Sequence, residues 1–399
     1  MKKRLHCYFI FLFISYTAFA QHPQKFDSLY KTIFAKDFCK MMREHPGIIL
    51  LDVRSAGEFS DTSQYNSLNM GHLKGAVNME IDTMKKNPWI LEQFRNKTVV
   101  VYCSHSQRSR RVSKLLTENG FTEFYNFNGG MSQLNQMTEE EFPCKSEWIV
   151  SGLGYNNISN KEAVNMIRHQ PGIVVLDIRP ETQFLSKDKT EENNIGKIRG
   201  AVNIPYAHIN QKISELGQFK NSPILVCAAS GDGDAARAAV ALVSTGYTKV
   251  YHLLGGLNDL VASESNLDFF ETNLPFTVLN ASGALSLLKK AASLKLYDTR
   301  PASEYNNQDK LSWKNLGNIR NALNVAEKDF ANILLPPDKN LPILVYGYNE
   351  AYKFAAMLSN KGYKKVYLMH GLYDFFWSSY NVDECRDARE FLVNHQGSY

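Results

Sequence analysis

Three segments of the chain repeat one pattern of apolar runs and polar loops. Each segment opens with an amphipathic stretch, continues with a buried-strand run that ends in Asp-x-Arg, and reaches a second apolar strand after a polar stretch. A helical pattern and a third short strand complete each segment. Short apolar runs that alternate with helical patterns are typical of parallel βαβ units, so the sequence predicts an α/β protein of three tandem units.

The landmarks recur in the same order at a period of about 120 residues, which predicts repeated domains. The Asp-x-Arg motifs are Asp52-Val53-Arg54, Asp177-Ile178-Arg179 and Asp298-Thr299-Arg300. The second strands are expected at 98–102, 223–226 and 342–345. We predict domains at 27–145, 153–268 and 275–385, followed by a C-terminal tail at 386–399.

The first twenty residues follow a different pattern. A basic start at Lys2, Lys3 and Arg4 precedes an apolar run, and Ala18-Phe19-Ala20 forms a small-x-small cleavage motif. This pattern predicts a secretory signal peptide at 1–20, and a membrane anchor is the alternative. The run is short for a membrane span of about 20 residues. We therefore expect an exported protein, periplasmic or secreted, with no membrane span after cleavage.

Composition limits the class of function. The 399 residues are 44% hydrophobic and 21% charged, with a net charge of +5, which is ordinary for a soluble globular protein. The cations are dispersed, so we expect no nucleic-acid partner. Cys39, Cys144 and Cys385 lie outside any reactive-looking loop, and the sequence leaves a Cys39–Cys144 disulfide open. Without a close Cys/His cluster, we expect no metal and no cofactor.

One loop of the first segment contains a candidate reactive cysteine. Cys103 ends the second strand and opens a polar run that leads into a helix; the run is Ser104, His105, Ser106, Gln107, Arg108 and Ser109. A loop between a parallel strand and a helix N-terminus presents backbone N–H groups and a helix dipole to an anion. Such a setting favours a cysteine thiolate, and Arg108 adds a permanent cation. The sequence therefore predicts a reactive Cys103, against the alternative of a buried structural cysteine.

The combined motifs of the first segment resemble the rhodanese domain. They are Asp52-Val53-Arg54 with Glu58-Phe59, Gly71 to Asn78, Cys103-x-x-x-x-Arg108-Ser109, Gly120-Phe121 and Gly129-Gly130. The resemblance covers nearly the whole mature chain in three copies and implies mainly parallel sheets flanked by helices. It also implies a sulfurtransferase, in which a cysteine takes a sulfane sulfur from a small sulfur anion or persulfide donor and passes it to cyanide or a thiol. Cys103 would be the nucleophile, and residues 104–109 would bind the transferred sulfur.

Two positions depart from the family's pattern. The family usually has glycine where Ser106 stands. Its two-domain thiosulfate sulfurtransferases carry arginine where Glu58 stands, which argues against thiosulfate as the natural donor. Glu58 is expected either to pair with Arg54 and brace the site or to be a solvated surface acid. Asp52 and Arg54 are expected to order the neighbouring strand end.

The other two segments have degraded loops. Cys227 is placed at the position of Cys103, in a loop two residues longer, and Asp234 stands where Arg108 stands. An acid there opposes a thiolate, so Cys227 is a doubtful second site. Tyr346 is placed at the cysteine position of the third segment, which we expect to be inactive. The second and third domains are candidates for binding a protein partner.

Rival functions remain at this stage. A non-catalytic binding, sulfur-carrier or redox module is the main alternative, because two of the three loops are degraded. A phosphatase-like activity is a weaker one, since the family's phosphatase cousins have one more residue between Cys and Arg. A Cys–His protease is disfavoured, because His105 lies in the same loop as Cys103 and is poorly placed to act as its base.

Overall fold

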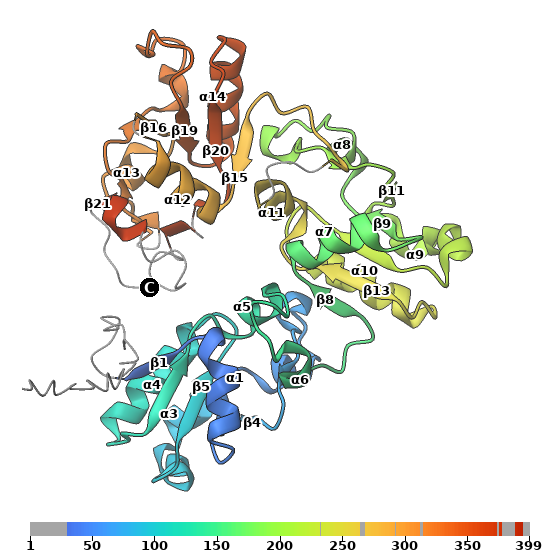
Figure 1. Ribbon diagram of the computed structural model, residues 1–399, viewed down its shortest axis with the longest axis vertical. Helices are drawn as coiled ribbons and strands as arrows, with labels where there is room; N and C mark the ends of the chain where they lie inside the picture. The colour runs from blue at the N-terminus through green and yellow to red at the C-terminus, as the bar shows by residue number, and fades with distance from the viewer. Residues whose placement is uncertain are drawn as a thin grey trace, which may run out of the picture.

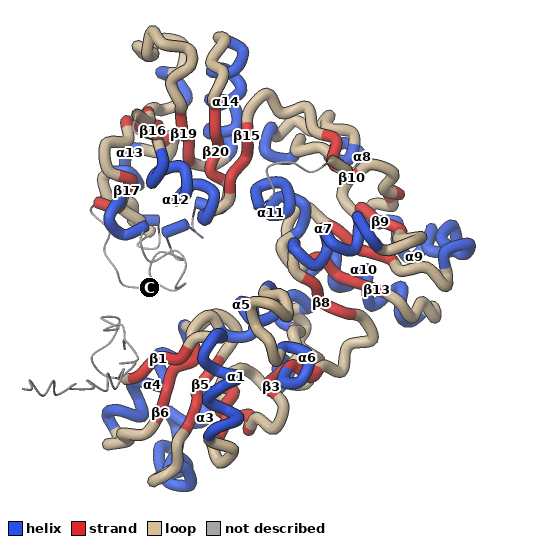
Figure 2. Tube along the Cα trace, in the orientation of Figure 1, coloured by secondary structure: helices blue, strands red, loops and turns tan. Residues whose placement is uncertain are grey.

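The computed structural model describes residues 30–231, 233–263, 268–291, 293–311, 314–372, 375–376 and 388–393. The predicted signal peptide at 1–20, Cys385 and most of the predicted tail lie outside the described residues. Figure 1 shows three lobes that follow one another along the chain, and Figure 2 shows strands at the centre of each lobe with helices around them. The prediction of three tandem α/β units is confirmed.

The first lobe is built on a five-stranded parallel sheet in the order β1-β6-β5-β2-β4. Its strands are β1 (Lys31–Ile33), β2 (Ile49–Asp52), β3 (His72–Leu73), β4 (Val77–Asn78), β5 (Val99–Tyr102), β6 (Phe124–Phe127) and β7 (Ile149–Val150). Its helices are α1 (Ala35–Glu44), α2 (Ala56–Phe59), η1 (Asn66–Leu68), α3 (Ile81–Lys86), η2 (Pro88–Phe94), α4 (Gln107–Glu118), α5 (Gly130–Gln136) and α6 (Lys145–Trp148).

The second lobe repeats this sheet in the order β8-β13-β12-β9-β11. Its strands are β8 (Asn156–Ile158), β9 (Val174–Asp177), β10 (Lys197–Ile198), β11 (Val202–Asn203), β12 (Ile224–Cys227), β13 (Val250–Leu253) and β14 (Phe270–Glu271). Its helices are α7 (Asn160–His169), α8 (Glu181–Phe184), η3 (Glu191–Asn193), η4 (Tyr206–His208), α9 (Ile209–Lys212), η5 (Ile213–Phe219), α10 (Gly233–Ser244) and α11 (Gly256–Ser263).

The third lobe has the order β15-β20-β19-β16-β18. Its strands are β15 (Thr277–Leu279), β16 (Lys295–Asp298), β17 (Asn318–Ile319), β18 (Leu323–Asn324), β19 (Ile343–Tyr346), β20 (Val366–Met369) and β21 (Leu392–Val393). Its helices include α12 (Ala281–Lys290), α13 (Ala302–Tyr305), η7 (Glu327–Asp329) and α14 (Asn349–Asn360).

The central strand of each sheet is apolar because helices cover both of its faces. All four residues of β5, of β12 and of β19 are buried. In the first lobe one apolar cluster contains Phe38 and Phe127, and another contains Val101, Val112 and Leu116 of α4. Burial on both sides explains why these strands are continuous apolar runs rather than alternating ones.

A small antiparallel ribbon closes each lobe. The pairs are β3 with β7, β10 with β14 and β17 with β21. Each ribbon pairs the two residues that follow Gly71, Gly196 or Gly317 with a segment beyond the last helices of the same lobe. Among the described residues, every helix is too short or too polar to cross a bilayer.

Candidate active site

Cys103 lies directly after β5, at the carboxyl edge of the first sheet. The residue is buried, with 1% of its surface exposed, and it belongs to the apolar cluster that contains Leu51 and Val53. Its thiol contacts the hydroxyl of Ser109 at 3.7 Å, and that hydroxyl donates to the carbonyl of Ser106 at 3.1 Å. Cys103 is thus placed at the base of the loop, where open α/β sheets hold their ligands.

The backbone of the loop has the form of an anion-binding nest. Within the described residues, no backbone N–H group from Ser104 to Ser109 donates a hydrogen bond. Ser106 adopts a left-handed conformation with φ 70°, and α4 begins at Gln107. A left-handed residue before a helix turns successive N–H groups toward one side, and the helix dipole adds positive charge there. The loop therefore offers unused donors to an anion.

The expected contact between these donors and the thiol is not observed. Within the described residues, Ser109 supplies the hydrogen-bond partner of the Cys103 sulfur, and no N–H group does. The unused N–H groups of the loop remain available to an atom bound above that sulfur, such as the outer sulfur of a persulfide.

Ser106 preserves the geometry that glycine usually provides. Its φ of 70° lies in the left-handed region, which glycine enters freely and other residues enter at a cost of about 1–2 kcal/mol. Its hydroxyl accepts a hydrogen bond from the Gly129 N–H at 2.6 Å. This bond offsets part of the conformational cost, so the departure from glycine keeps the loop shape.

The turn at Gly129-Gly130 brings the backbone of α5 into hydrogen-bonding contact with the Cys103 loop. The N–H groups of Met131 and Ser132 donate to the carbonyls of Cys103 and Ser104 at 2.9 and 3.0 Å. A Cβ atom at position 130 would lie 2.2 Å from the Cys103 carbonyl oxygen. Glycine at 130 is therefore required for the backbone approach that fixes Cys103.

Arg108 is held by Glu58 in a two-pronged ion pair. Its two terminal nitrogens donate to the two Glu58 carboxylate oxygens at 2.5 and 2.6 Å, and one also donates to the Ser104 hydroxyl at 2.8 Å. Burial acts to raise the pKa of Glu58, but hydrogen bonds from Arg108 and Ser55 outweigh it and lower that pKa. The hydrogen bond to Glu58 raises the pKa of Arg108, with a smaller contribution from the charge of Cys103.

The expectation for Glu58 is thereby corrected. It neither pairs with Arg54 nor lies on a solvated surface, since only 3% of it is exposed and its ion pair is with Arg108. The local reason is the capping box of α2, in which the Ser55 hydroxyl accepts from the Glu58 N–H and the Glu58 carboxylate accepts from the Ser55 N–H. The cap fixes the carboxylate beside the loop.

Asp52 and Arg54 form a buried brace, as expected, but one shared by all three lobes. The Arg54 guanidinium donates to the Asp52 carboxylate at 2.7 Å and to the Gly71 carbonyl at 2.7 Å. The pairs Asp177–Arg179 and Asp298–Arg300 make the same contacts, with the carbonyls of Gly196 and Gly317. Because the brace also occurs beside the degraded loops, it serves the fold rather than the chemistry.

The placement of Cys227 is corrected by strand register. Cys227 lies opposite Asp177, as Tyr102 lies opposite Asp52 and Tyr346 lies opposite Asp298. The residue equivalent to Cys103 is Ala228, whose carbonyl accepts from the N–H of α11, as the Cys103 carbonyl does from α5. Cys227 is therefore a strand residue with no exposed surface, and burial together with the charge of Asp177 raises the pKa of its thiol.

The third lobe has Gly347, not Tyr346, at the position of Cys103. Tyr346 is equivalent to Tyr102, and both hydroxyls accept a hydrogen bond from the ribbon, from Ile319 and from Leu73 respectively. The loop before α14 is two residues shorter than the loop before α4, and the loop before α10 is one residue longer rather than two. Neither degraded loop has a cysteine at the position of Cys103, which Ala228 and Gly347 occupy.

Tyr102 is a residue of the site region that sequence reasoning missed. Its hydroxyl accepts from the Leu73 N–H at 3.0 Å, and burial together with the charge of Asp52 raises its pKa well above the usual value. The signal was present, because Tyr102-Cys103 and Tyr346-Gly347 align directly at the two strand ends.

The remaining predicted site residues of the loop differ in exposure. The side chains of His105 and Gln107 are exposed, while Ser104 and Ser109 are buried. Although His105 reaches solvent, partial desolvation beside the loop and then the positive charge of Arg108 lower its pKa. No group of three or more metal-ligating side chains gathers anywhere in the part of the chain that the structure describes.

Comparisons with known proteins agree with this architecture. A family model for the rhodanese-like domain matches residues 34–137, 159–263 and 281–377. The chain therefore belongs to the rhodanese-like domain family and contains three copies of its domain.

Individual relatives match only parts of their own length. The uncharacterised protein YqhL of Bacillus subtilis (strain 168) is 36% identical over 84 residues, which is 21% of this chain and 58% of that protein. The tRNA uridine(34) hydroxylase of Acinetobacter baumannii (strain AYE) is 29% identical over 105 residues, or 25% of this chain and 30% of that protein.

Among solved structures, the thiosulfate sulfurtransferase from Pseudomonas aeruginosa is 14% identical with a TM-score of 0.23, covering 86% of this chain and 66% of that one. Wild-type EanB is 17% identical with a TM-score of 0.27, covering 89% of this chain and 96% of that one.

Proposed function

We propose that the protein is an exported sulfurtransferase that carries sulfane sulfur as a persulfide on Cys103. The observation that carries the proposal is the loop of the first lobe. A cysteine stands at the strand end, and the following N–H groups have no acceptor within the described residues. Such a nest stabilises an anion of the size of a sulfur atom.

The reaction consists of two displacements at sulfur. The Cys103 thiolate attacks the outer sulfur of a sulfane donor, the donor's sulfur–sulfur bond breaks, and the donor leaves with the electron pair. A thiolate or cyanide acceptor then attacks the outer sulfur of the Cys103 persulfide. The Cys103 thiolate leaves with its electron pair, so the enzyme is regenerated without net oxidation.

The loop residues have separate roles in this reaction. The N–H groups from Ser104 to Ser109 hold the outer sulfur, and the Ser109 hydroxyl contacts the inner sulfur of Cys103. Arg108 braces the loop through Glu58 and Ser104 rather than acting as a free anion clamp. Because Glu58 balances the charge of Arg108, the site is suited to a persulfide donor more than to a doubly charged one.

Export is supported by the sulfur chemistry of the first lobe. Cys39 and Cys144 form a disulfide, with their Cα atoms 5.9 Å apart. Structural disulfides persist mainly in oxidising compartments. The pairing agrees with the signal-peptide pattern of the N-terminus, which lies outside the described residues.

A binding role is the second candidate, and a specific observation favours it for the second and third lobes. Ala228 and Gly347 stand at the nucleophile position, so neither loop can form a persulfide there. In this alternative the protein is a scaffold, and Cys103 has no catalytic turnover.

Mass spectrometry of the mature chain tests the proposal. After incubation with a panel of sulfane donors, we expect the mass to increase by one sulfur atom and the added sulfur to be lost on addition of cyanide. The Cys103→Ser variant should gain nothing, whereas Cys227→Ala should gain one sulfur like the wild type. A wild-type chain that gains no sulfur from any donor would favour the scaffold.

A further inference from the structure

The two junctions between lobes share one arrangement. At the first junction α10 of the second lobe packs against η1 of the first lobe, and at the second junction α14 packs against η3. The first strand of each following lobe also contacts the last helix of the sheet before it. At the first junction β8 contacts α5, and at the second β15 contacts α11. In each case the helix after the degraded loop is covered by the 3-10 turn of the preceding lobe.

The second junction shows which positions of the helix are covered. The Glu192 N–H donates to the side-chain oxygen of Asn349, the first residue of α14, at 3.3 Å. A groove at this junction is lined by Glu191 on one side and by Lys353 and Lys361 on the other. Glu191 of η3 therefore lies near Lys353 of α14, whereas Glu192 lies near Glu350 of the same helix.

Among the described residues, no element of another lobe packs closely against α4. The elements against which α4 packs are β5, β6 and α3, all of the first lobe. In Figure 1 α4 lies on the side of the first lobe away from the second lobe. Because α4 and α14 have equal length, Arg111 corresponds to Lys353 and Lys114 to Ala356, and both Arg111 and Lys114 are exposed.

On this face of α4, Lys114 pairs with Glu118 at 3.9 Å, whereas Arg111 makes no ion pair within the described residues, unlike its equivalents in the other two lobes. Arg237 of α10 pairs with Asp234 of its own helix, and Lys353 of α14 pairs with Glu327 at 2.8 Å. The residue of α4 equivalent to Asp234 is Arg108, whose charge is balanced by Glu58, so α4 offers Arg111 no acid at this position. Arg111 thus stands one turn from the catalytic loop on a face that favours an acidic partner.

We propose that the α4 face, defined by Gln107, Arg111 and Lys114, docks an acidic turn of another protein, which delivers sulfur to Cys103 or receives it. The identity of the exchanged group rests on the proposed sulfur transfer. The partner occupies the place that η1 and η3 occupy on the other two helices. Its acids contact Arg111 and Lys114 while its thiol or persulfide reaches the Cys103 loop.

A second copy of this chain does not suit the same face. At the positions of Glu191-Glu192-Asn193 the third lobe has Ser312-Trp313-Lys314. In sequence, the third lobe therefore lacks both acids at these positions and has a lysine in their place, which would meet Arg111 and Lys114 with like charge. The partner is a different, acidic protein.

Peptides of matched chemistry test this docking. Three peptides carry one cysteine flanked by glutamate, glutamine or lysine, and each is used as the acceptor of sulfur from loaded Cys103. At low salt we expect the wild type to transfer to the acidic peptide at least about 10-fold faster than to the lysine peptide, and the preference to fall with added salt. The Arg111→Glu/Lys114→Glu variant should lose this preference.

Two controls distinguish a failure of the docking proposal from a failure of the proposed sulfur transfer. The Lys36→Glu/Lys40→Glu variant changes the net charge equally on exposed positions of α1 and should keep the preference. A wild type without preference, or equal loss in both variants, overturns the docking, while transfer to cyanide reports separately on the proposed function. Fluorescence anisotropy with cysteine-blocked peptides must show the same order of binding, and it decides the docking even if Cys103 accepts no sulfur.

Discussion

At the scale of single residues, the charge beside Cys103 is balanced within the loop itself. Glu58 binds both terminal nitrogens of Arg108, and only 4% of the Glu58 side chain is exposed. The pair is close to neutral as a unit. The field that favours a sulfur anion therefore comes mainly from the backbone N–H groups and the N-terminus of α4.

The Glu58→Gln variant is expected to show an altered dependence of stability on pH. The folded pKa of Glu58 is lowered from 4.5, so its ionised form contributes stability above about pH 4.5, and this contribution is lost as pH falls through the lower folded pKa. The unfolding free energy of the wild type should exceed that of the variant most at neutral pH. Urea denaturation between pH 7 and pH 3 measures the difference, which should shrink in the acid range.

A matched variant in the third lobe controls for general destabilisation. Glu304 is equivalent to Glu58 and is also buried, where it contacts Lys314 and Tyr348. Glu304→Gln should lower stability without slowing sulfur loading of Cys103, whereas Glu58→Gln should slow it. A stability difference for Glu58→Gln that stays constant with pH would contradict the role assigned to its charge.

The place of Cys103 at the end of a strand could be predicted from sequence, and the ion pair between Arg108 and Glu58 could not. Cys103 breaks an apolar run at a strand end, which is a local signal. Glu58 and Arg108 lie far apart in the chain, and their pairing depends on how the cap of α2 directs a side chain. Cys227 was misplaced by one residue because matching cysteine to cysteine overrode the alignment of the two strand-end tyrosines, which strand register decides.

At the scale of elements, the strand–loop–helix unit around Cys103 depends on the turn before α5. Both glycines of this turn have positive φ, and Gly130 brings its backbone against the carbonyls of Cys103 and Ser104. The parallel strands themselves could be predicted, because burial on both faces makes them continuous apolar runs. The two-residue ribbons could not, since such short strands leave no periodicity in the sequence.

The Gly130→Ala variant should disturb the site more than Gly120→Ala. Both positions have positive φ, of 60° and 74°, so alanine is strained at each by about 1 kcal/mol. At Gly120 an added Cβ meets nothing within 4 Å, whereas at Gly130 it meets backbone carbonyls. We expect a loss of roughly 2–4 kcal/mol and slower sulfur loading for Gly130→Ala. Denaturation and loading rates measure both, and equal effects of the two variants would contradict this account.

At the scale of the whole molecule, the three lobes are joined by polar contacts between neighbours. Lys145 at the end of the first lobe pairs with Glu162 of α7 at 2.9 Å, and Asp61 accepts from the linker residues Ser151 and Gly152. The repetition of the fold could be predicted from recurring motifs. The junctions could not, because they depend on residues such as Lys145 and Glu162 that belong to no repeated motif.

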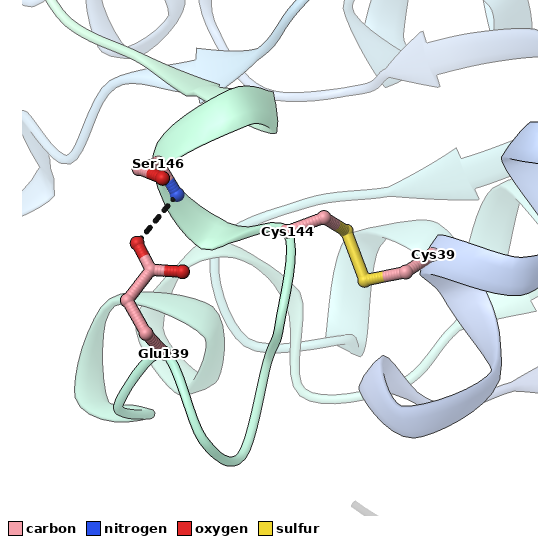
Figure 3. The surroundings of a disulfide bond; sticks show 4 residues. All are labelled: Cys39, Glu139, Cys144 and Ser146. Carbon is pink, nitrogen blue, oxygen red and sulfur yellow. Dashed lines mark hydrogen bonds between the residues drawn. A yellow bond between two sulfur atoms is a disulfide. The ribbon is translucent and has the colours of Figure 1, made fainter.

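The disulfide connects the first helix of the first lobe to the segment that leads into the second lobe. Figure 3 shows Cys39 on α1 joined to Cys144, next to the hydrogen bond from the Ser146 N–H to Glu139. The bond closes a loop with a sequence separation of 105, and the same segment continues into β7, which pairs with β3. Closing a loop of about 100 residues restricts the unfolded chain by up to about 4.7 kcal/mol.

Reduction should therefore destabilise the first lobe selectively. We expect the Cys39→Ala/Cys144→Ala variant to lower the unfolding free energy of this lobe by about 2–5 kcal/mol, because the unfolded chain regains its freedom. Calorimetry with and without a reductant measures the effect. In the wild type one transition should move to lower temperature and the transitions of the other two lobes should stay in place, whereas the variant should not respond to reductant. An equal shift of all transitions would mean that the lobes unfold as one unit, and no shift would mean that the bond does not stabilise the lobe that carries Cys103.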